Sequence, residues 1–89
     1  MTWQVGLTGK APKQAKKLPK KVADLLKALR AEIVVSGPIR GNWPNYSKLG
    51  HNEHHCHLTY KYVACWREKD KKVQIVEVYY VGSREKAPY

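Results

Sequence analysis

The sequence contains no Phe, one Met and only two Cys among its 89 residues. With so few cysteines a disulfide framework is not expected, and Cys56 and Cys65 are predicted to be free thiols that pack as small apolar residues. No apolar run approaches the roughly 18 residues that a membrane helix requires. The start, MTWQVGLTGK, lacks the basic and apolar regions of a signal peptide. We therefore expect residues 1–89 to form one soluble, cytoplasmic domain with a small core.

Acidic residues are also scarce. Seven Asp and Glu oppose seventeen Lys and Arg, which gives a formal net charge of +10. Self-repulsion of this size favours a partner of opposite sign, either a nucleic acid or an acidic protein. The two are compatible, because a protein inhibitor can imitate a nucleic acid.

What the sequence does contain is a clear order of elements. Alternating residues predict a strand over 2–8, and helical spacing predicts helices over 10–18 and 19–37. A loop rich in Gly, Pro, Asn and Ser covers 38–52. Three strands are then predicted over 54–59, 60–68 and 72–83. The order β-α-α-β-β-β predicts an α+β fold: a small antiparallel sheet of about four strands with an N-terminal helical hairpin on one face.

Two of these segments also predict which side chains face the core. Apolar residues in 19–37 form one helical stripe, namely Val22, Leu25, Leu26, Leu29 and Ile33. Strict alternation in the last strand places Val73, Ile75, Glu77, Tyr79 and Val81 on one side, and Gln74, Val76, Val78 and Tyr80 on the other.

Two stretches carry a resemblance to a known family. The ending VYYVGSREKAPY combines a last strand, a Gly, a basic residue and a near-terminal Tyr, and HCHLTYKYVACW resembles two middle strands. With the element order, the size and the basic charge, the chain resembles the RelE/ParE superfamily of bacterial type II toxins, and its ending resembles the RelE-like branch.

The resemblance implies a toxin that cleaves mRNA on the ribosome without a metal or a small-molecule cofactor, and that a cognate antitoxin, expected to be acidic, inhibits. Arg84 matches the Arg after the last strand, Tyr89 the C-terminal Tyr, and Lys61 the basic residue early in the third strand. His55 and His57 occupy the places of alternating basic residues on the second strand. ParE-like members instead poison DNA gyrase and lack the catalytic set.

The residue types suit the chemistry. Cleavage by 2′-OH attack needs a base, positive donors for the phosphate and an acid for the leaving oxygen. Imidazole titrates near neutral pH, and Arg presents a permanently charged fork. On a strand, His55 and His57 project to one face, about 7 Å apart, whereas Cys56 projects into the core. Lys61 would lie beside them on the neighbouring strand, with Arg84 and Tyr89 arriving from the tail.

Further residues are candidates for binding RNA without catalysis. They are Lys10, Lys13, Lys16, Lys17, Lys20 and Lys21, together with His54 at the loop end of its strand. A zinc site is the less favoured alternative for the histidines. The usual ligand spacings are absent, and Cys56 is expected to point away from its neighbours. No metal is therefore predicted.

Two rival functions remain open on the sequence alone. A ParE-like gyrase inhibitor would not need the imidazole and basic cluster on the open sheet face. A small RNA-binding module without catalysis would bind RNA through the same residues but cleave nothing.

Overall fold

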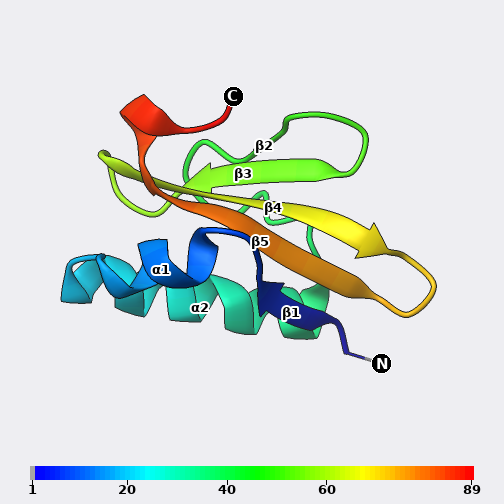
Figure 1. Ribbon diagram of the computed structural model, residues 1–89. Helices are drawn as coiled ribbons and strands as arrows, with labels where there is room; N and C mark the ends of the chain where they lie inside the picture. The colour runs from blue at the N-terminus through cyan, green and yellow to red at the C-terminus, as the bar shows by residue number, and fades with distance from the viewer. Residues whose placement is uncertain (1) are drawn as a thin grey trace.

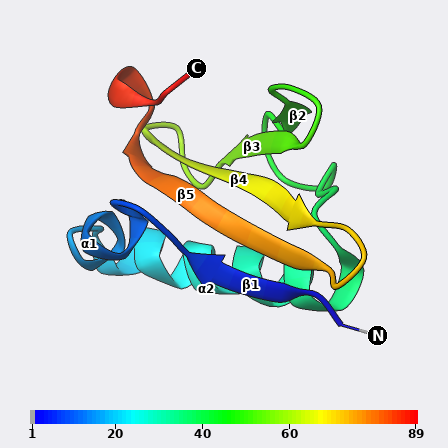
Figure 2. The same cartoon turned by 45° about the vertical axis from the view of Figure 1, so that its right-hand side comes forward.

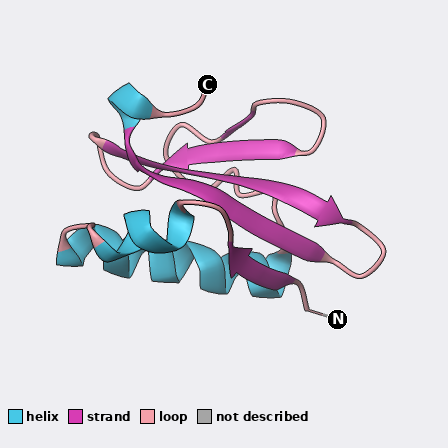
Figure 3. Cartoon of the chain, in the orientation of Figure 1, coloured by secondary structure: helices cyan, strands magenta, loops and turns pink. Residues whose placement is uncertain are grey.

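The computed structural model describes residues 2–89, in which two helices pack on one face of a five-stranded sheet (Figures 1 and 3). The elements in chain order are β1 (Gln4–Leu7), α1 (Ala11–Lys16), α2 (Lys20–Ser36), β2 (Ser47–Lys48), β3 (Glu53–His57), β4 (Tyr62–Asp70), β5 (Ile75–Ser83) and the 3-10 turn η1 (Arg84–Lys86). The strands lie in the order β1-β5-β4-β3-β2. The predicted α+β class is confirmed, with one strand more than expected because residues 47–48 also pair with β3.

All neighbouring strands are antiparallel except β1 and β5, which pair in parallel at one edge of the sheet. Beyond β1 the edge of β5 is covered by α1, whose Gln14 side-chain oxygen accepts the Val81 backbone N–H at 3.1 Å. A side chain therefore satisfies a backbone donor that no strand reaches, which an exposed sheet edge requires.

Helix α2 buries the stripe that its sequence predicts. Val22, Leu26, Leu29 and Ile33 are buried, and burial of each such side chain contributes roughly 1.5–3 kcal/mol. The helix ends at Ser36 and is capped by Gly37, whose φ of +92° suits only a residue without a side chain. A Cβ at this position would also lie 3.1 Å from Trp3 Nε1. Within residues 2–89, no helix is long and apolar enough to cross a bilayer.

The helices meet a sheet face built from small and aromatic residues. Cys56, Trp66, Val76 and Val78 are fully buried in this core. The indole of Trp66 donates to the Pro38 carbonyl oxygen at 3.0 Å, so the largest core side chain has no unpaired polar atom.

Strand β5 departs from strict alternation. Cys65 of β4 pairs with Tyr80 while the next residue, Trp66, pairs with Val78, so Tyr79 has no partner. This β-bulge shifts the alternation by one residue, and Val81 joins Val76 and Val78 in the core. The prediction that Val81 shares a face with Tyr79 is therefore wrong, because one unopposed residue lies between the two halves of the strand.

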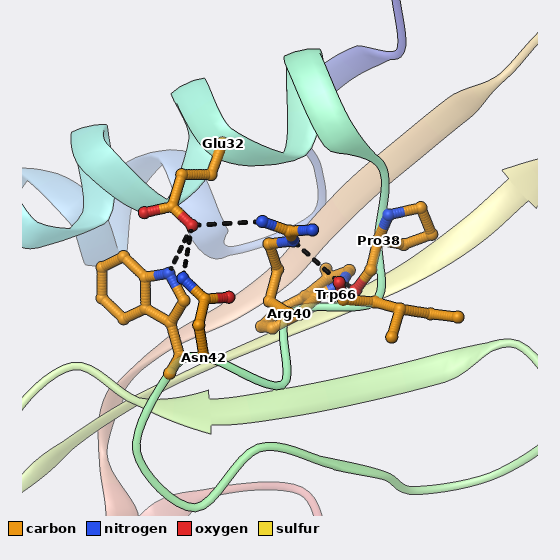
Figure 4. A network of polar contacts seen from close by, with 7 residues as sticks. Glu32, Pro38, Arg40, Asn42 and Trp66 are labelled. Carbon is orange, nitrogen blue, oxygen red and sulfur yellow. Dashed lines mark hydrogen bonds and ion pairs between the residues drawn. The ribbon is translucent and has the colours of Figure 1, made fainter.

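The loop after α2 is held by one carboxylate (Figure 4). Oxygen Oε1 of Glu32 accepts hydrogen bonds from Arg40 at 3.2 Å, Asn42 at 2.9 Å and the indole of Trp43 at 3.0 Å. The bonds from Asn42 and Trp43 hold the pKa of Glu32 below its ordinary value. Trp43 packs against the core edge. The loop that leads into β2 and β3 is thereby fixed to α2.

Candidate functional site

The two central histidines lie on the sheet face that the helices leave free. His55 pairs with Cys65 and His57 with Val63 across β3 and β4, and the two imidazole centroids are 6.0 Å apart. Cys56, between them, is buried in the opposite, helix-covered face. The period of two along a strand accounts for this division.

The C-terminal segment, residues 84–89, crosses the same free face (Figures 1 and 2). The ring centroid of Tyr89 is 4.4 Å from that of His55. Cys65 and Val63, the cross-strand partners of His55 and His57, have no exposed surface, although neither belongs to the helix-covered core. This face of the sheet therefore has a second, smaller buried region, on which Tyr89 packs through His55.

This packing changes the acid–base properties of the site. Burial lowers the pKa of His55, and the neighbouring His57 lowers it further, whereas a hydrogen bond at Ser47 opposes the shift. The Ser47 hydroxyl lies 3.1 Å from His55 Nδ1 and fixes the ring. A lowered pKa keeps the imidazole neutral near pH 7, so one ring nitrogen is free to accept a proton.

Tyr89 has the opposite character. Burial raises the pKa of its phenol, and Arg84 only partly offsets this effect. The hydroxyl therefore stays protonated at neutral pH and can donate a hydrogen bond. The residue is 54% exposed, so its ring also offers a surface on which a nucleobase can stack.

Arg84 and Lys61 meet at the end of the sheet. The backbone N–H of Arg84 donates to the Lys61 carbonyl oxygen at 2.9 Å. The Arg84 guanidinium lies 4.4 Å above the ring of Tyr60, a cation–π contact. These three residues line a hollow of about 270 Å³.

Lys61 requires a correction of position. It was expected on a strand beside the histidines, but it lies in the turn before β4. The N–H groups of Leu58 and Thr59 both donate to the Tyr62 carbonyl, which closes the turn over residues 58–62. The residue opposite His57 is consequently the apolar Val63.

His54 also requires a correction. It was expected among the RNA-binding residues, but it has no exposed surface. Its Nε2 lies 2.7 Å from Glu68 Oε2 and its Nδ1 lies 2.7 Å from the Tyr46 hydroxyl. Its ring stacks between Tyr46 and Trp66, with both centroid distances 5.9 Å. Like Cys56, His54 points toward the helix-covered core. Both of its ring nitrogens have hydrogen-bond partners there, so it is a core residue.

The predicted lysines are all exposed, but they do not form one group with the histidines. Lys20 pairs with Asp24 at 3.0 Å on the surface of α2. Lys10 and Lys17 line a hollow of about 510 Å³ between α1 and the end of β5, which Lys13 and Lys16 do not. Position therefore divides a run of lysines that looks uniform in the sequence.

Another hollow, of about 620 Å³, lies at the far end of the sheet and is lined by Glu53, Glu68 and Glu77 as well as by Arg67 and Lys69. Both cations pair with Glu77, at 3.2 and 3.4 Å. Its carboxylates make it a poor place for a phosphate. Among residues 2–89, no three His, Cys, Asp or Glu side chains are grouped so that they could hold a metal ion.

Sequence reasoning missed three residues of the site. Tyr60 stacks on Arg84, Ser47 contacts His55, and the buried Cys65 lies opposite His55 on the neighbouring strand. The alternation of aromatic and basic residues in TYKY could have indicated Tyr60. No local pattern indicates Ser47, because its contact depends on the pairing of β2 with β3.

Comparison with solved structures gives matches over nearly the whole chain. The RelE–RelB complex from Pyrococcus horikoshii matches with a TM-score of 0.75 and 16% identity, over 98% of this chain and 100% of that chain. A double Arg-to-Ala mutant of the E. coli toxin RelE in the free state matches with a TM-score of 0.75 and 22% identity, over 98% and 88% of the two chains. The YoeB dimer from Staphylococcus aureus gives 0.70 and 13%, over 89% and 93%.

The sequence itself matches no model of a known protein family and no curated protein. The likeness is therefore one of structure, and at these low sequence identities it supports a shared fold. The resemblance that the sequence indicated is confirmed at this level: the chain has the fold of the RelE-like toxins.

Proposed function

We propose that residues 1–89 form a single toxin domain of a type II toxin–antitoxin system, which acts in the cytoplasm as a metal-independent mRNA endoribonuclease on the ribosome. One observation carries the proposal. His55, His57 and Tyr89, from β3 and the C-terminal segment, lie together on the face without helices, with ring distances of 6.0 and 4.4 Å. The chain that presents them carries a formal charge of +10.

The roles follow from the chemistry of each group. His55, whose pKa is lowered by burial, is the base that takes the 2′-OH proton. His57 then protonates the leaving 5′ oxygen. Arg84 and Lys61 stabilise the charge that grows on the phosphate. Tyr89 stacks on a base or donates a hydrogen bond from its protonated phenol.

An acidic antitoxin is the proposed protein partner. Structures of the same fold were solved as a RelE–RelB complex, a YoeB–YefM complex and the toxin–antitoxin complex RelBE2. The net charge of +10 suits a partner of opposite sign. Such a partner would neutralise the toxin by covering the basic surface or by displacing residues 84–89.

The test is primer extension on cellular mRNA after brief induction of the wild type, His55→Ala, Arg84→Ala and the surface control Lys72→Ala. We expect cuts at defined codon positions in the wild type and in the control, and their loss in the other two variants. Supercoiling of a plasmid by purified gyrase is measured in parallel. Inhibited gyrase with intact message would overturn the proposal in favour of a ParE-like activity. RNA binding without cuts would leave only a binding module.

A further inference from the structure

Two neighbouring hollows lie at one end of the sheet. The larger lies between α1 and β5 and is lined in part by Lys10, Lys17, Tyr80 and Lys86. The smaller is lined by Tyr60, Lys61 and Arg84. Tyr62 and Ser83 line both, so the two hollows are neighbours. We call the pair of hollows the aromatic–basic track, whose basic and aromatic residues are Lys10, Lys17, Lys86, Lys61, Arg84, Tyr60, Tyr62 and Tyr80.

The track has a strong charge of one sign. Five cationic side chains line it, and Glu85 is the only carboxylate among its lining residues. The hollow at the other end of the sheet, in contrast, is lined by three glutamates and by two cations, Arg67 and Lys69, which are both paired with Glu77. The track therefore attracts a polyanion more strongly than the hollow at the other end of the sheet does.

The aromatic residues give the track a second property. Tyr60 is 73% exposed, and its ring already carries the Arg84 guanidinium at 4.4 Å. The stacked tyrosine ring and guanidinium present planar surfaces on which a nucleobase can stack in turn. Cations for phosphates interleaved with rings for bases are the features by which proteins bind single strands without sequence preference.

A short segment of chain links the track to the candidate site. Arg84 and Lys86 belong to η1, and Tyr89, which contacts His55, follows three residues after it. We infer that single-stranded RNA extending from the candidate site lies in this track, with bases on Tyr60 and Tyr62 and phosphates at Lys10, Lys17 and Lys86. The inference rests on the proposed function, because that function puts the start of the bound RNA at the candidate site. It also separates Lys10 and Lys17 from the four other lysines of residues 10–21.

The test uses fluorescence anisotropy with 2′-O-methyl oligouridylates, which lack the attacking hydroxyl, in lengths of about 3 and about 12 nucleotides. Wild-type affinity should rise at least tenfold with length. In the double variant Lys10→Ala/Lys17→Ala this gain should largely disappear, and the salt slope should fall by about 0.7 for each lost phosphate contact. The charge-matched control Lys71→Ala/Lys72→Ala, in the distant β4–β5 turn, should keep the gain.

Tyr60 is tested separately. Tyr60→Ala should weaken binding of the longer oligomer about fivefold or more, whereas Tyr60→Phe, which keeps the ring, should bind as the wild type does. Far-ultraviolet circular dichroism checks that each variant is folded.

Three results would overturn the inference. The first is an affinity for RNA that does not depend on the length of the oligomer. The second is an equal loss of affinity in the Lys71/Lys72 control. The third is track variants that bind RNA as the wild type does but no longer bind an acidic helical peptide, which would make the track a protein-docking surface. Failure of the proposed function gives a different result: no mRNA is cut in cells, but binding of the oligomers in vitro still depends on their length.

Discussion

The ring of Tyr89 lies 4.4 Å from that of His55 at an interplanar angle of 47°. One ring ends the C-terminal segment and the other comes from the middle of β3. Through this contact the tail helps to bury the imidazole, and burial is the main cause of the lowered His55 pKa. The state of the proposed base therefore depends on whether the tail is in place.

The first prediction follows from this contact. Tyr89→Ala should raise the pKa of His55 toward its ordinary value of 6.5, because the ring regains water, whereas Tyr89→Phe should leave it unchanged. NMR titration of the His55 ring measures the value directly. Equal pKa values in all three proteins would show that Tyr89 does not bury His55.

The first prediction has a second readout, because the same pKa shift of His55 affects stability. Because the folded-state pKa of His55 lies below 6.5, the unfolded chain binds protons more readily in the interval below that value. His55 should therefore make the protein less stable as the pH falls through this interval. Urea unfolding of the wild type and His55→Gln, compared at pH 7 and pH 5, checks the sign, and the variant should lose less stability on acidification.

The second prediction concerns catalysis. His55→Ala and His57→Ala should each reduce the single-turnover rate of cleavage of ribosome-bound mRNA by about 100-fold or more, since each removes a proton-transfer group. His51→Ala is the control, because His51 is exposed and lies outside β3. Comparable rates in all three variants would remove the histidines from the mechanism.

The third prediction tests the role of His54. His54→Ala should lower the free energy of unfolding by roughly 2–4 kcal/mol, because it leaves a cavity and removes the partners of Glu68 and Tyr46. Chemical denaturation gives the value, and His51→Ala should change it by less than about 0.5 kcal/mol. If His54→Ala weakened RNA binding without affecting stability, the core assignment would be wrong.

The fourth prediction concerns the loop that Glu32 holds. Glu32→Gln should lower stability by roughly 1 kcal/mol at neutral pH, because a neutral amide accepts the three hydrogen bonds less strongly. The lowered pKa of Glu32 means that its stabilisation is present above the ordinary value of 4.5 and is lost as the pH falls through the folded value. The difference between variant and wild type should thus shrink in acid. A difference independent of pH would argue against a role for the charge.

The fifth prediction concerns the two thiols. Burial raises the pKa of Cys56 and of Cys65 to about 12, so neither forms a thiolate at neutral pH. Labelling by a disulfide reagent should therefore be slower in the native protein than in urea by on the order of 100-fold or more. Tyr89→Ala should speed labelling of Cys65, because Tyr89 packs on His55, the cross-strand partner of Cys65, but it should not speed labelling of Cys56 in the helix-covered core. Fast native labelling of both would contradict the packing on both faces of the sheet.

The sequence predicted the regular parts of the structure well. The stripe of α2 and the opposite directions of Cys56 and His55 follow from helical and strand periods, which are local properties. The same strand rule places His54 inside with Cys56, so its burial follows from a local signal that the prediction of RNA binding did not use. Its partner Glu68 lies on another strand, and no spacing along the chain indicates that pairing.

The remaining errors have non-local causes. Lys61 lies off the strand because the position of the turn depends on which residues of β3 and β4 pair, and Val63 takes the place opposite His57. The direction of Val81 depends on a bulge that Cys65 and Trp66 of β4 impose from across the sheet. Single-strand patterns do not contain this information.

The unopposed Tyr79 also governs where the chain leaves the sheet. Deleting Tyr79 would remove the bulge and keep the later faces, because Val78, Tyr80 and Val81 already lie opposite three consecutive residues of β4. If Tyr79 were instead paired with Cys65, every later residue would exchange inside for outside, and Val81 would leave the core. Arg84 and Tyr89 would then leave the sheet toward the helices, on the wrong side of the molecule to meet His55. A one-residue insertion in the phase of a strand thus decides on which side the C-terminus arrives.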